Sequence, residues 1–336
     1  MVLDVALTLL ASGFAAALGL GAAMLWLSTR LALLAHPNAR SSHARPTPTG
    51  GGVMFALPVL AYLAWLAWLG SVPAAGLAAA GAALTVTGFW DDARELPAWS
   101  RLLVQLAAAA AVVGTVMPQA GGLLMLAVAV AVAWHINLYN FMDGIDGIAA
   151  TQALVFVLGA QIVAGGLPGW SGDLSWLAAG GLVAFLAYNW PPARMFMGDA
   201  GSGFLGLLTA GLAVLWWQQQ ALPLTCSLIL LAWFWFDATS TLIVRAVTGQ
   251  AFTQAHRSHL YQKLAAKRGH LWTTVCLLLY AVLWLLPLAW LCAVTRPRSL
   301  LLDLAWVAAA AIPLALAAWR FRAGIPDRDH HRTASL

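Results

Sequence analysis

Long apolar runs, interrupted only by short polar segments, constrain this chain more than any other feature. The run "LLMLAVAVAVAWHI" (123–136) contains almost no polar atom, and hydrophobic residues make up 62% of the chain while charged residues make up 9%. Ordinary soluble domains contain about 45–50% apolar and about 25% charged residues. Because lipid offers no partner to a backbone amide, such runs cross a membrane as α-helices. The sequence therefore predicts an all-α, polytopic transmembrane bundle.

The number of helices follows from the length needed to cross the hydrocarbon, which is about 20 residues. Several candidates are short or rich in glycine, so we expect ten or eleven spans. The first runs past the length of a signal-peptide core and lacks a clear cleavage site, which predicts a retained anchor. The candidates are approximately 2–27, 53–72, 74–90, 101–118, 121–136, 147–166, 174–190, 202–218, 222–246, 271–293 and 299–319.

The cations predict the orientation of this bundle. Lys and Arg are enriched in the cytoplasmic loops of membrane proteins, and nearly all of them flank one set of alternate connections; only Arg296 and Arg298 oppose the assignment. With eleven spans, the N-terminus lies outside and the C-terminus inside. Topology and anionic lipid explain the net charge of +5, so no nucleic-acid partner is expected. The three cysteines lie in apolar runs and suggest neither a disulfide nor a thiolate metal site.

Five polar segments lie on the predicted cytoplasmic side, whereas the outer connections are short and chemically plain. Polar clusters on one face of one membrane point to one site. We therefore expect a single domain, 1–336, with an active cytoplasmic face. The five segments are 30–52, 91–101, 137–147, 189–203 and 247–270.

Two pairs of acids stand out in these segments. Asp91 and Asp92 end a predicted helix, where the helix dipole disfavours negative charge and adjacent carboxylates raise each other's pKa. This predicts a bound cation or a role in proton transfer, although such a pair can also simply solvate a helix end. Asp143 and Asp146 lie three residues apart, on one side of a starting helix. N-capping of that helix is the alternative.

The fourth segment contains a Gly-x-Gly-x-x-Gly spacing at Gly201, Gly203 and Gly206. A dinucleotide fold would need a preceding strand, and none is predicted. We expect these glycines to allow close packing of helices in the bilayer. Asp199, just before them, could cap the helix or hold a metal.

The fifth segment is basic. His256 and His259 flank Arg257, and further Lys and Arg residues follow. A basic segment beside a membrane binds lipid headgroups by default, and it would equally clamp a diphosphate, because Arg presents paired donors to phosphate oxygens.

The donor atoms in these segments favour a hard cation. Carboxylate and amide oxygens suit Mg²⁺ or Mn²⁺, which is typically shared between one or two carboxylates and substrate phosphates, and zinc is not expected without thiolates. The residues alone predict a membrane enzyme that acts on a phosphate ester or a diphosphate at the cytoplasmic surface.

The order of the motifs resembles a known enzyme family. "HPNARSSHARPTPTGGG", "GFWDDARELPAWSRLLVQ", "NLYNFMDGIDGIAA", "ARMFMGDAGSGFLG" and "HRSHLYQKL" are similar, in this order, to motifs of the polyprenyl-phosphate N-acetylhexosamine-1-phosphate transferases, of glycosyltransferase family 4 type. Relatives include the phospho-N-acetylmuramoyl-pentapeptide transferase of peptidoglycan synthesis. The resemblance covers about residues 30–270. It implies that a UDP-N-acetylhexosamine donates its sugar-1-phosphate to a membrane polyprenyl phosphate and that UMP leaves.

The resemblance also implies roles for single residues. Asn140 and Asp199 would hold Mg²⁺, for which Mn²⁺ could substitute. Asp91 and Asp92 would position or deprotonate the lipid phosphate, with their individual roles left open. The implied catalytic residues are Asp91, Asp92, Asp199 and His259, and the implied substrate-binding residues are Asn137, Asp143, Asp146 (near the uracil), Asn189, Phe196 (stacked on the base), His256 and Arg257.

Departures from the family pattern indicate which branch of the family the chain resembles. "HRSHLYQ" replaces the consecutive histidines of other branches and resembles the branch that starts O-antigen or related surface-polysaccharide synthesis on undecaprenyl phosphate, in the bacterial inner membrane. Glu95 stands near a position where many relatives carry a third acid or a Lys, so metal roles there are open. GlcNAc, FucNAc and QuiNAc are alternative sugars. Dimers occur in the family, which leaves a homodimer open.

Asp237 lies within an expected span, where a charge costs about 2.5–3.5 kcal/mol. We expect it inside the bundle, protonated or paired with Arg245 two turns later, in a structural or a supporting catalytic role. His330 and His331 lie in a polar tail and are expected to play no part.

Two other classes of protein share some of these features. A solute transporter would also carry intramembrane acids, but near the midplane in broken helices. A CDP-alcohol phosphotransferase is the nearer alternative, since "DGIDGIA" resembles its acidic signature. That signature needs two further Asp residues along the following helix, and "TQALVFVLGAQIVAGG" contains none.

Overall fold

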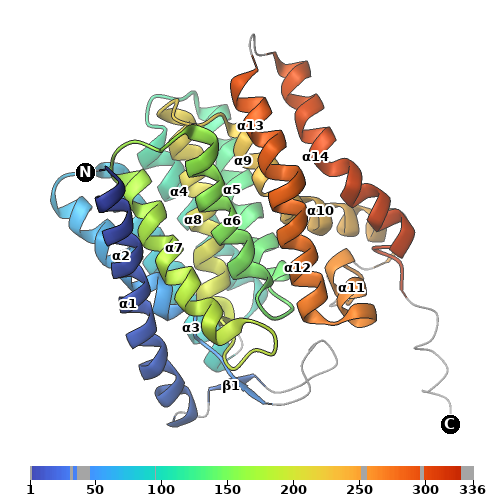
Figure 1. Ribbon diagram of the computed structural model, residues 1–336, viewed down its shortest axis with the longest axis horizontal. Helices are drawn as coiled ribbons and strands as arrows, with labels where there is room; N and C mark the ends of the chain where they lie inside the picture. The colour runs from blue at the N-terminus through green and yellow to red at the C-terminus, as the bar shows by residue number, and fades with distance from the viewer. Residues whose placement is uncertain are drawn as a thin grey trace.

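Helices account for nearly all of the chain that the computed structural model describes, namely residues 2–30, 33–35, 46–94, 96–250, 256–295 and 299–326. Most of them stand side by side along one direction (Figure 1). The all-α prediction is confirmed, apart from a two-residue antiparallel ladder between β1 (Leu34–Ala35) and β2 (Thr47–Pro48). The helices are α1 (Val2–Arg30), α2 (Val53–Trp68), α3 (Val72–Arg94), α4 (Ala98–Val116), α5 (Gly122–Met142), α6 (Ile148–Ala164), α7 (Gly169–Asn189), α8 (Gly198–Gln218), α9 (Leu224–Leu230), α10 (Ala232–Val247), α11 (Leu260–Arg268), α12 (His270–Tyr280), the π-helical turn η1 (Ala281–Leu285), α13 (Leu286–Val294) and α14 (Leu300–Phe321).

Fewer helices are long and apolar enough to span a membrane than the sequence predicted. Among the described residues, seven helices are long and apolar enough to cross a membrane, or eight if the bent pair α9 and α10 counts as one span. The expected ten or eleven also included α2, α6 and α7. Helices α2 and α6 have only 16 and 17 residues, and α7 carries Ser171, Asp173 and Ser175 in its first two turns.

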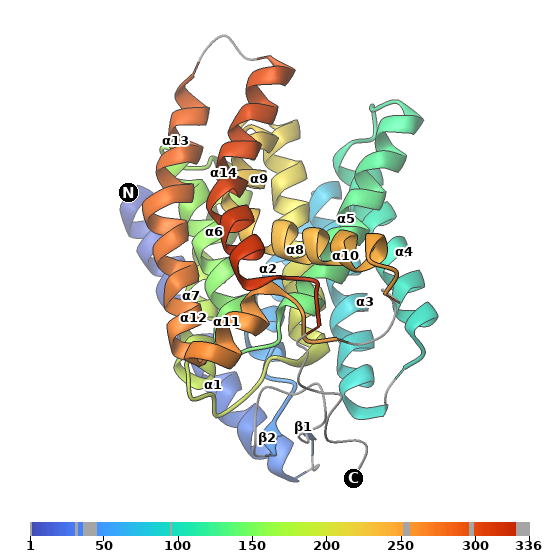
Figure 2. The ribbon, with the colours of Figure 1, turned by 90° about the vertical axis from the view of Figure 1, so that its right-hand side faces the viewer.

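The expected single span 222–246 is two helices. Helices α9 and α10 meet at 75°, and α10 lies across the others in Figure 2. The reason is the polar stripe of α10: Asp237, Thr241 and Arg245 follow one another at intervals of four residues and are all buried. A straight continuation of α9 would carry this stripe along the hydrocarbon, where buried charge is costly.

Helix α8 is the centre of the bundle, and small residues let its neighbours approach it. Almost its whole length is buried. A Cβ added at Gly201 would lie 2.7 Å from the Cα of Gly52, and one added at Gly206 would lie 2.8 Å from the Cα of Ile136. These two glycines confirm the expected close packing. A Cβ at Gly203 meets nothing within 4 Å, so the third glycine of the spacing has no such role.

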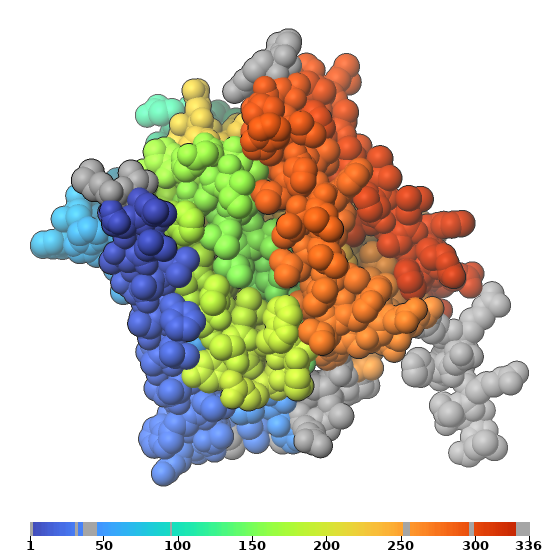
Figure 3. All heavy atoms as spheres, in the orientation of Figure 1, coloured from blue at the N-terminus to red at the C-terminus, as the bar shows by residue number. Residues whose placement is uncertain are grey.

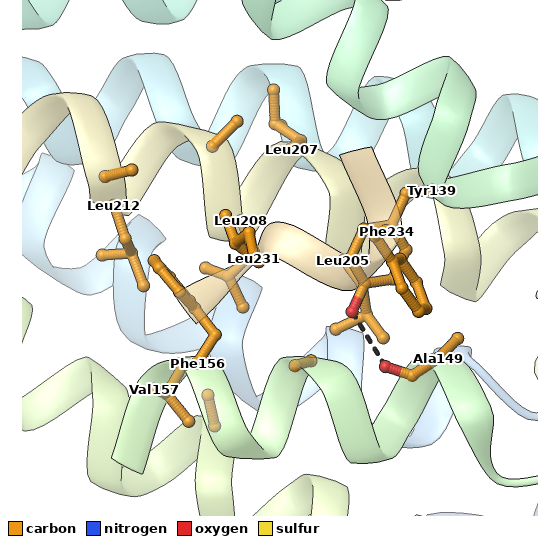
Figure 4. Packing of buried hydrophobic residues seen from close by; sticks show 14 of the residues in the cluster. Tyr139, Ala149, Phe156, Val157, Leu205, Leu207, Leu208, Leu212, Leu231 and Phe234 are labelled. Atoms are coloured by element: carbon orange, nitrogen blue, oxygen red, sulfur yellow. Dashed lines mark hydrogen bonds between the residues drawn. The ribbon is translucent and has the colours of Figure 1, made fainter. Parts of the chain in front are cut away.

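Aromatic side chains fill the space between α5, α6, α8 and the α9–α10 bend (Figure 4). The ring centroids of Tyr139 and Phe234 lie 4.8 Å apart, and the Tyr139 hydroxyl donates a 2.8 Å hydrogen bond to the carbonyl oxygen of Ala149. Phe156 stacks on Trp216 with centroids 5.5 Å apart. These contacts fix the end of α5 and the start of α6, and with them the acidic segment between these helices.

The outer helices expose apolar side chains, as contact with lipid requires. Helices α12, α13 and α14 form one side of the molecule in Figure 3. On α14, Leu301 and Trp319 each expose 80% of their surface. In water such a surface would be unfavourable, so it supports the membrane prediction independently of helix length.

The contact between α3 and α8 gives a prediction for stability. A Cβ at Gly88 would lie 2.4 Å from the backbone of Asp199 and Ala200. Gly88→Ala should therefore push α3 away from α8 and destabilise the protein by about 1–3 kcal/mol. Gly114→Ala is the matched control, because a Cβ there meets nothing within 4 Å; it should be neutral or slightly stabilising. Thermal unfolding in detergent measures both, and equal melting temperatures would contradict the packing argument.

Candidate active site

Described parts of all five polar segments meet at one end of the bundle, the lower end in Figure 1. They come from the α3–α4, α5–α6 and α7–α8 connections, from residues 46–52 before α2, and from the basic segment before α11. Acids that are far apart in the sequence are therefore neighbours, as the sequence predicted. Residues 36–45, 251–255, Glu95, His330 and His331 lie outside the described residues.

Arg101 joins two of the predicted catalytic acids. Its Nη1 atom lies 2.7 Å from Oδ2 of Asp91 and 3.2 Å from Oδ2 of Asp199. Asp91 also accepts a hydrogen bond from the backbone N–H of Leu96. The sequence predicted a bound cation or a role in proton transfer for the acid pair at the end of α3. The structure places a side chain of the protein, Arg101, beside Asp91, and the bound cation stays a prediction.

Asp92 is stabilised differently, by the first turn of α8. Its carboxylate accepts hydrogen bonds from the backbone N–H groups of Asp199 (2.9 Å) and Ala200 (3.5 Å). Helix N-termini carry partial positive charge, so they stabilise an anion there. Gly198 has φ +71°, and a Cβ on it would lie 2.2 Å from Oδ2 of Asp92. Glycine is thus required at this position both by its backbone conformation and by its contact.

Asn140 connects α5 to Asp199, the acid that Arg101 also contacts. Its Nδ2 donates to Oδ1 of Asp199 (2.8 Å) and to Oγ of Ser202 (2.9 Å). Asp199 thus faces a guanidinium on one oxygen and an amide on the other. Asn137 lies one turn earlier on α5 and is half-buried. Its side chain makes no hydrogen bond within the described part of the chain.

Asp143 follows α5 and lies near two other acids. Burial, together with the negative charges of Asp199 and Asp146, raises the pKa of its carboxyl to about 8. The side chain is therefore largely protonated at neutral pH in the protein alone. A cation arriving at this site would favour the release of that proton.

Asp146 holds two connections together. Its Oδ2 accepts from the N–H of Ala193 (3.0 Å), and its Oδ1 lies 3.1 Å from Nδ1 of His270. Helix α6 begins after Gly147 and has no side-chain cap. The alternative that Asp143 or Asp146 caps this helix is therefore wrong.

Both the oxygen and the nitrogen of the Asn189 side-chain amide make hydrogen bonds within the protein. Its Oδ1 accepts from the N–H of Gly147 (2.9 Å), and its Nδ2 donates to the carbonyl oxygen of Met195 (2.8 Å). Asn189 therefore fixes the α7–α8 connection against the α5–α6 connection. Its predicted contact with a nucleoside stays a prediction.

Phe196 lies in the connection between α7 and α8 and is half-buried. Its N–H donates to the carbonyl oxygen of Pro48 (2.8 Å), and its carbonyl oxygen accepts from the N–H of Gly51 (2.9 Å). The "TPTGGG" part of the first polar segment thus runs along the α7–α8 connection and fixes the backbone of Phe196.

The basic segment presents an exposed Arg257 between two histidines. The ring centroids of His256 and His259 lie 4.9 Å apart. Burial, together with the nearby His259 and Arg245, lowers the pKa of His256 to about 4, so this ring is neutral at pH 7. Lys263 is turned away, because its Nζ donates to the carbonyl oxygen of Ile325 (2.7 Å).

Three residues of the site were not predicted as such: Arg101, Ser202 and His270. Arg101 was read only as a cation that reports topology. The available signal was its place at the end of the segment that Asp91 begins, ten residues later. For Ser202 and His270, the sequence offered no signal beyond their polarity.

The donor atoms fit a divalent ion held jointly with a substrate. No three His, Cys, Asp or Glu side chains in the described ranges form a metal cage. The Asp199 carboxylate and the Ser202 hydroxyl offer hard oxygen atoms, as Mg²⁺ prefers when it also binds waters and phosphates. Asn140 directs its Nδ2 at both of them, so its amide would have to turn over to offer its oxygen to an ion. The residues present therefore fit Mg²⁺ or Mn²⁺, with Arg101 as the cation that balances Asp199 in the protein alone.

Comparison of the sequence with known proteins finds similarity to one family of transferases. Residues 74–217 match the family model "Glycosyl transferase family 4". The chain is 28% identical over 300 residues to a decaprenyl-phosphate N-acetylglucosaminephosphotransferase of Mycobacterium leprae, covering 76% of this chain and 75% of that one. It is 26% identical over 258 residues to a probable undecaprenyl-phosphate N-acetylglucosaminyl 1-phosphate transferase of Bacillus subtilis (71% and 72%). A phospho-N-acetylmuramoyl-pentapeptide-transferase of Chlamydia muridarum is 45% identical over 101 residues (28% and 30%).

The raised pKa of Asp143 predicts how stability depends on pH. The carboxyl binds its proton more tightly in the folded protein, with a pKa of about 8, than in the unfolded chain, with a pKa of about 3.9. Its contribution is therefore complete below pH about 4 and lost as the pH rises through about 8. Asp143→Asn should be more stable than the wild type at pH 8.5, without donor or divalent ion, and the difference should vanish towards pH 4. Melting temperatures across this range provide the check.

Asp303→Asn, near the start of α14, is the control for this measurement, because Asp303 lies far from the site. It should show the pH dependence of the wild type. A constant offset between Asp143→Asn and the wild type at all pH values would show that the acid does not titrate in this range.

Proposed function

Because the chain belongs to glycosyl transferase family 4, we propose that it transfers N-acetylhexosamine-1-phosphate from a UDP-sugar to a polyprenyl phosphate. The observation that carries this proposal is the meeting of Asp91, Asn140 and Asp199 around Arg101 at one end of a membrane bundle. This arrangement supports chemistry on phosphates beside a lipid.

The reaction joins two anions, so its main barrier is electrostatic. An oxygen of the polyprenyl phosphate attacks the β-phosphorus of the donor, the bond from that phosphorus to the bridging oxygen breaks, and UMP leaves with the bridging oxygen. Asp199 and Asn140 would hold Mg²⁺ or Mn²⁺, which neutralises the diphosphate when bound. Arg101 lies 3.2 Å from Asp199 and 2.7 Å from Asp91, so it can add positive charge where the two phosphates meet.

On this proposal, Asp91 and Asp92 have different roles. Asp92 is held by the amides that begin α8, so it fixes the helix that carries Asp199. Asp91 is paired with a side chain that can change partners, which favours Asp91 as the acid that meets the lipid phosphate. Both remain in the proposed catalytic set, together with Asp199 and His259.

The nucleotide would lie over the α5–α6 and α7–α8 connections. Phe196 offers a ring for the base, and Asp143 and Asp146 line the pocket, with Asp146 nearest the uracil. Asn189 shapes this pocket through its two hydrogen bonds, and Asn137 extends it along α5. The basic segment with His256, Arg257 and His259 would steady the diphosphate or the sugar.

The site would face the cytoplasm. Arg94 ends α3, Arg101 lies in the first turn of α4, and Arg194 and Arg257 lie in connections. All four are at the acidic end of the bundle, which supports this orientation by the positive-inside rule. The proposed topology counts α2, α6 and α7 among eleven spans and places the N-terminus outside, in a bacterial inner membrane.

The sugar and the pathway are part of the proposal. The printed names of two relatives specify N-acetylglucosamine on decaprenyl or undecaprenyl phosphate, which favours GlcNAc over FucNAc and QuiNAc. We propose that the product starts O-antigen or related surface-polysaccharide synthesis. The bend between α9 and α10, with buried Asp237 beside it, is a feature that a transporter would share, but the other acids gather at one end of the bundle. The CDP-alcohol alternative has gained no supporting observation.

The direct test incubates purified protein with undecaprenyl phosphate and, separately, the UDP derivatives of GlcNAc, FucNAc and QuiNAc. Mass spectrometry should detect the lipid-diphosphate-sugar and an equal amount of UMP, and EDTA should stop the reaction until Mg²⁺ or Mn²⁺ is returned. Formation of free sugar-phosphate without a lipid product, or transfer that continues in EDTA, would contradict the proposal.

Asp199→Asn tests the centre of the site. The amide cannot supply the negative charge that a divalent ion needs, so transfer should fall at least about 100-fold, the range seen when one stabilising group is removed from an active site. The protein should still fold, since its amide can bond to Asn140. Asp173→Asn, in the first turns of α7 at the opposite end, should transfer at the wild-type rate. Near-normal turnover by Asp199→Asn would remove the metal assignment.

A further inference from the structure

Asp237 is a buried acid for which the proposed reaction has no direct use. It lies on α10 and exposes only 1% of its surface. The sequence suggested Arg245 as its partner, but within the described residues its carboxylate is turned to α11 instead. Oδ1 accepts from the N–H of Leu260 (2.7 Å), and Oδ2 accepts from the N–H of Tyr261 (2.9 Å). The Thr241 hydroxyl donates to Oδ1 as well (3.3 Å).

The same carboxylate lies beside His259. Nδ1 of His259 is 3.8 Å from Oδ1 of Asp237, and both side chains are buried. His259 is the residue that precedes α11, and its backbone N–H donates to Oε1 of Gln262 (3.2 Å). Asp237 therefore fixes the backbone on the C-terminal side of His259 and also faces its ring.

Helix α11 is fixed in turn to the acidic connection after α5. The Tyr261 hydroxyl donates to the carbonyl oxygen of Phe141 (2.9 Å). A Cβ at Gly144 would overlap that hydroxyl oxygen, so the Tyr261 side chain packs directly on the backbone of Gly144. Burial raises the pKa of Tyr261, with further contributions from Asp237 and Asp143, so the hydroxyl keeps the proton it donates.

The other side of the basic segment is held by the chain after α14. The N–H of Gly324 donates to the carbonyl oxygen of Ser258 (2.8 Å), and Lys263 donates to that of Ile325. The segment around Arg257 and His259 is thus anchored on both sides while the Arg257 side chain stays exposed.

We propose that Asp237 is a positioning residue, which holds His259 and Arg257 at the correct distance from the Asp143–Asp146 connection for the donor diphosphate. This inference rests on the proposed function. A helix start needs only one side-chain oxygen, such as that of Ser, Thr or Asn. A carboxylate here bonds two amides at once and places a negative charge 3.8 Å from Nδ1 of His259, which couples α10 to the start of α11.

The test is Asp237→Asn. The amide keeps one acceptor for α11, loses the other and loses the negative charge beside His259. We expect kcat for UDP-sugar to fall about 100-fold, as small displacements of binding groups can cause. Binding of uridine, which lacks the diphosphate, should keep its Kd, as measured by titration calorimetry. Ser175→Ala is the matched control, since Ser175 is equally buried and hydrogen bonds within α7; it should transfer normally.

A double-mutant cycle separates positioning from general stability. If Asp237 acts through His259, the variant with both Asp237→Asn and His259→Gln should be within about twofold of the slower single variant. A purely structural role would instead make the two losses multiply. Tyr261→Phe keeps the ring and removes only the bond to Phe141, so it should lower kcat in the same direction even if Asp237→Asn does not fold.

The outcomes distinguish this inference from the proposed function. If the wild type itself produces no lipid-diphosphate-sugar, the proposed function fails. If the wild type transfers and Asp237→Asn transfers at the same rate, or the losses multiply, or Tyr261→Phe is fully active, the positioning role of Asp237 is wrong and the function stands.

Discussion

The contact of α3 with the first turn of α8 is the interaction on which the site depends. Two glycines make it possible: Gly88 brings α3 against the backbone of α8, and Gly198 leaves room for the Asp92 carboxylate. Once α8 begins there, its amides bind Asp92 and its Asp199 reaches Arg101. A bundle with larger residues at these positions could still cross a membrane, but it would separate the two acids that the proposed chemistry needs together.

Charge balance explains why so many acids can gather at the boundary of a lipid bilayer. Each one has a different compensation: Arg101 for Asp91, the start of α8 for Asp92, Asn140 and Arg101 for Asp199, and a retained proton for Asp143. These compensations are of the kind that an arriving cation or phosphate can replace. On the proposed function, the donor diphosphate and its divalent ion would take over these contacts.

The bend between α9 and α10 has a comparable consequence for the basic segment. It turns a polar stripe out of the span and brings Asp237 under the start of α11. Through Tyr261, α11 then rests on the α5–α6 connection. Segments of opposite charge are thus built into one rigid unit, although about one hundred and twenty residues separate Tyr261 from Phe141, its partner.

Much of this protein could be predicted from its sequence, because hydrophobicity and spacing are local properties. They predicted an all-α membrane bundle and the gathering of the polar segments at one end. They failed where partners are chosen across the fold: the bent 222–246 segment, the α11 start as the partner of Asp237, and Arg101 as a member of the site. Which carboxylate meets which donor depends on distances between residues far apart in the chain, and only the packing of α3, α5, α8 and α10 sets those distances.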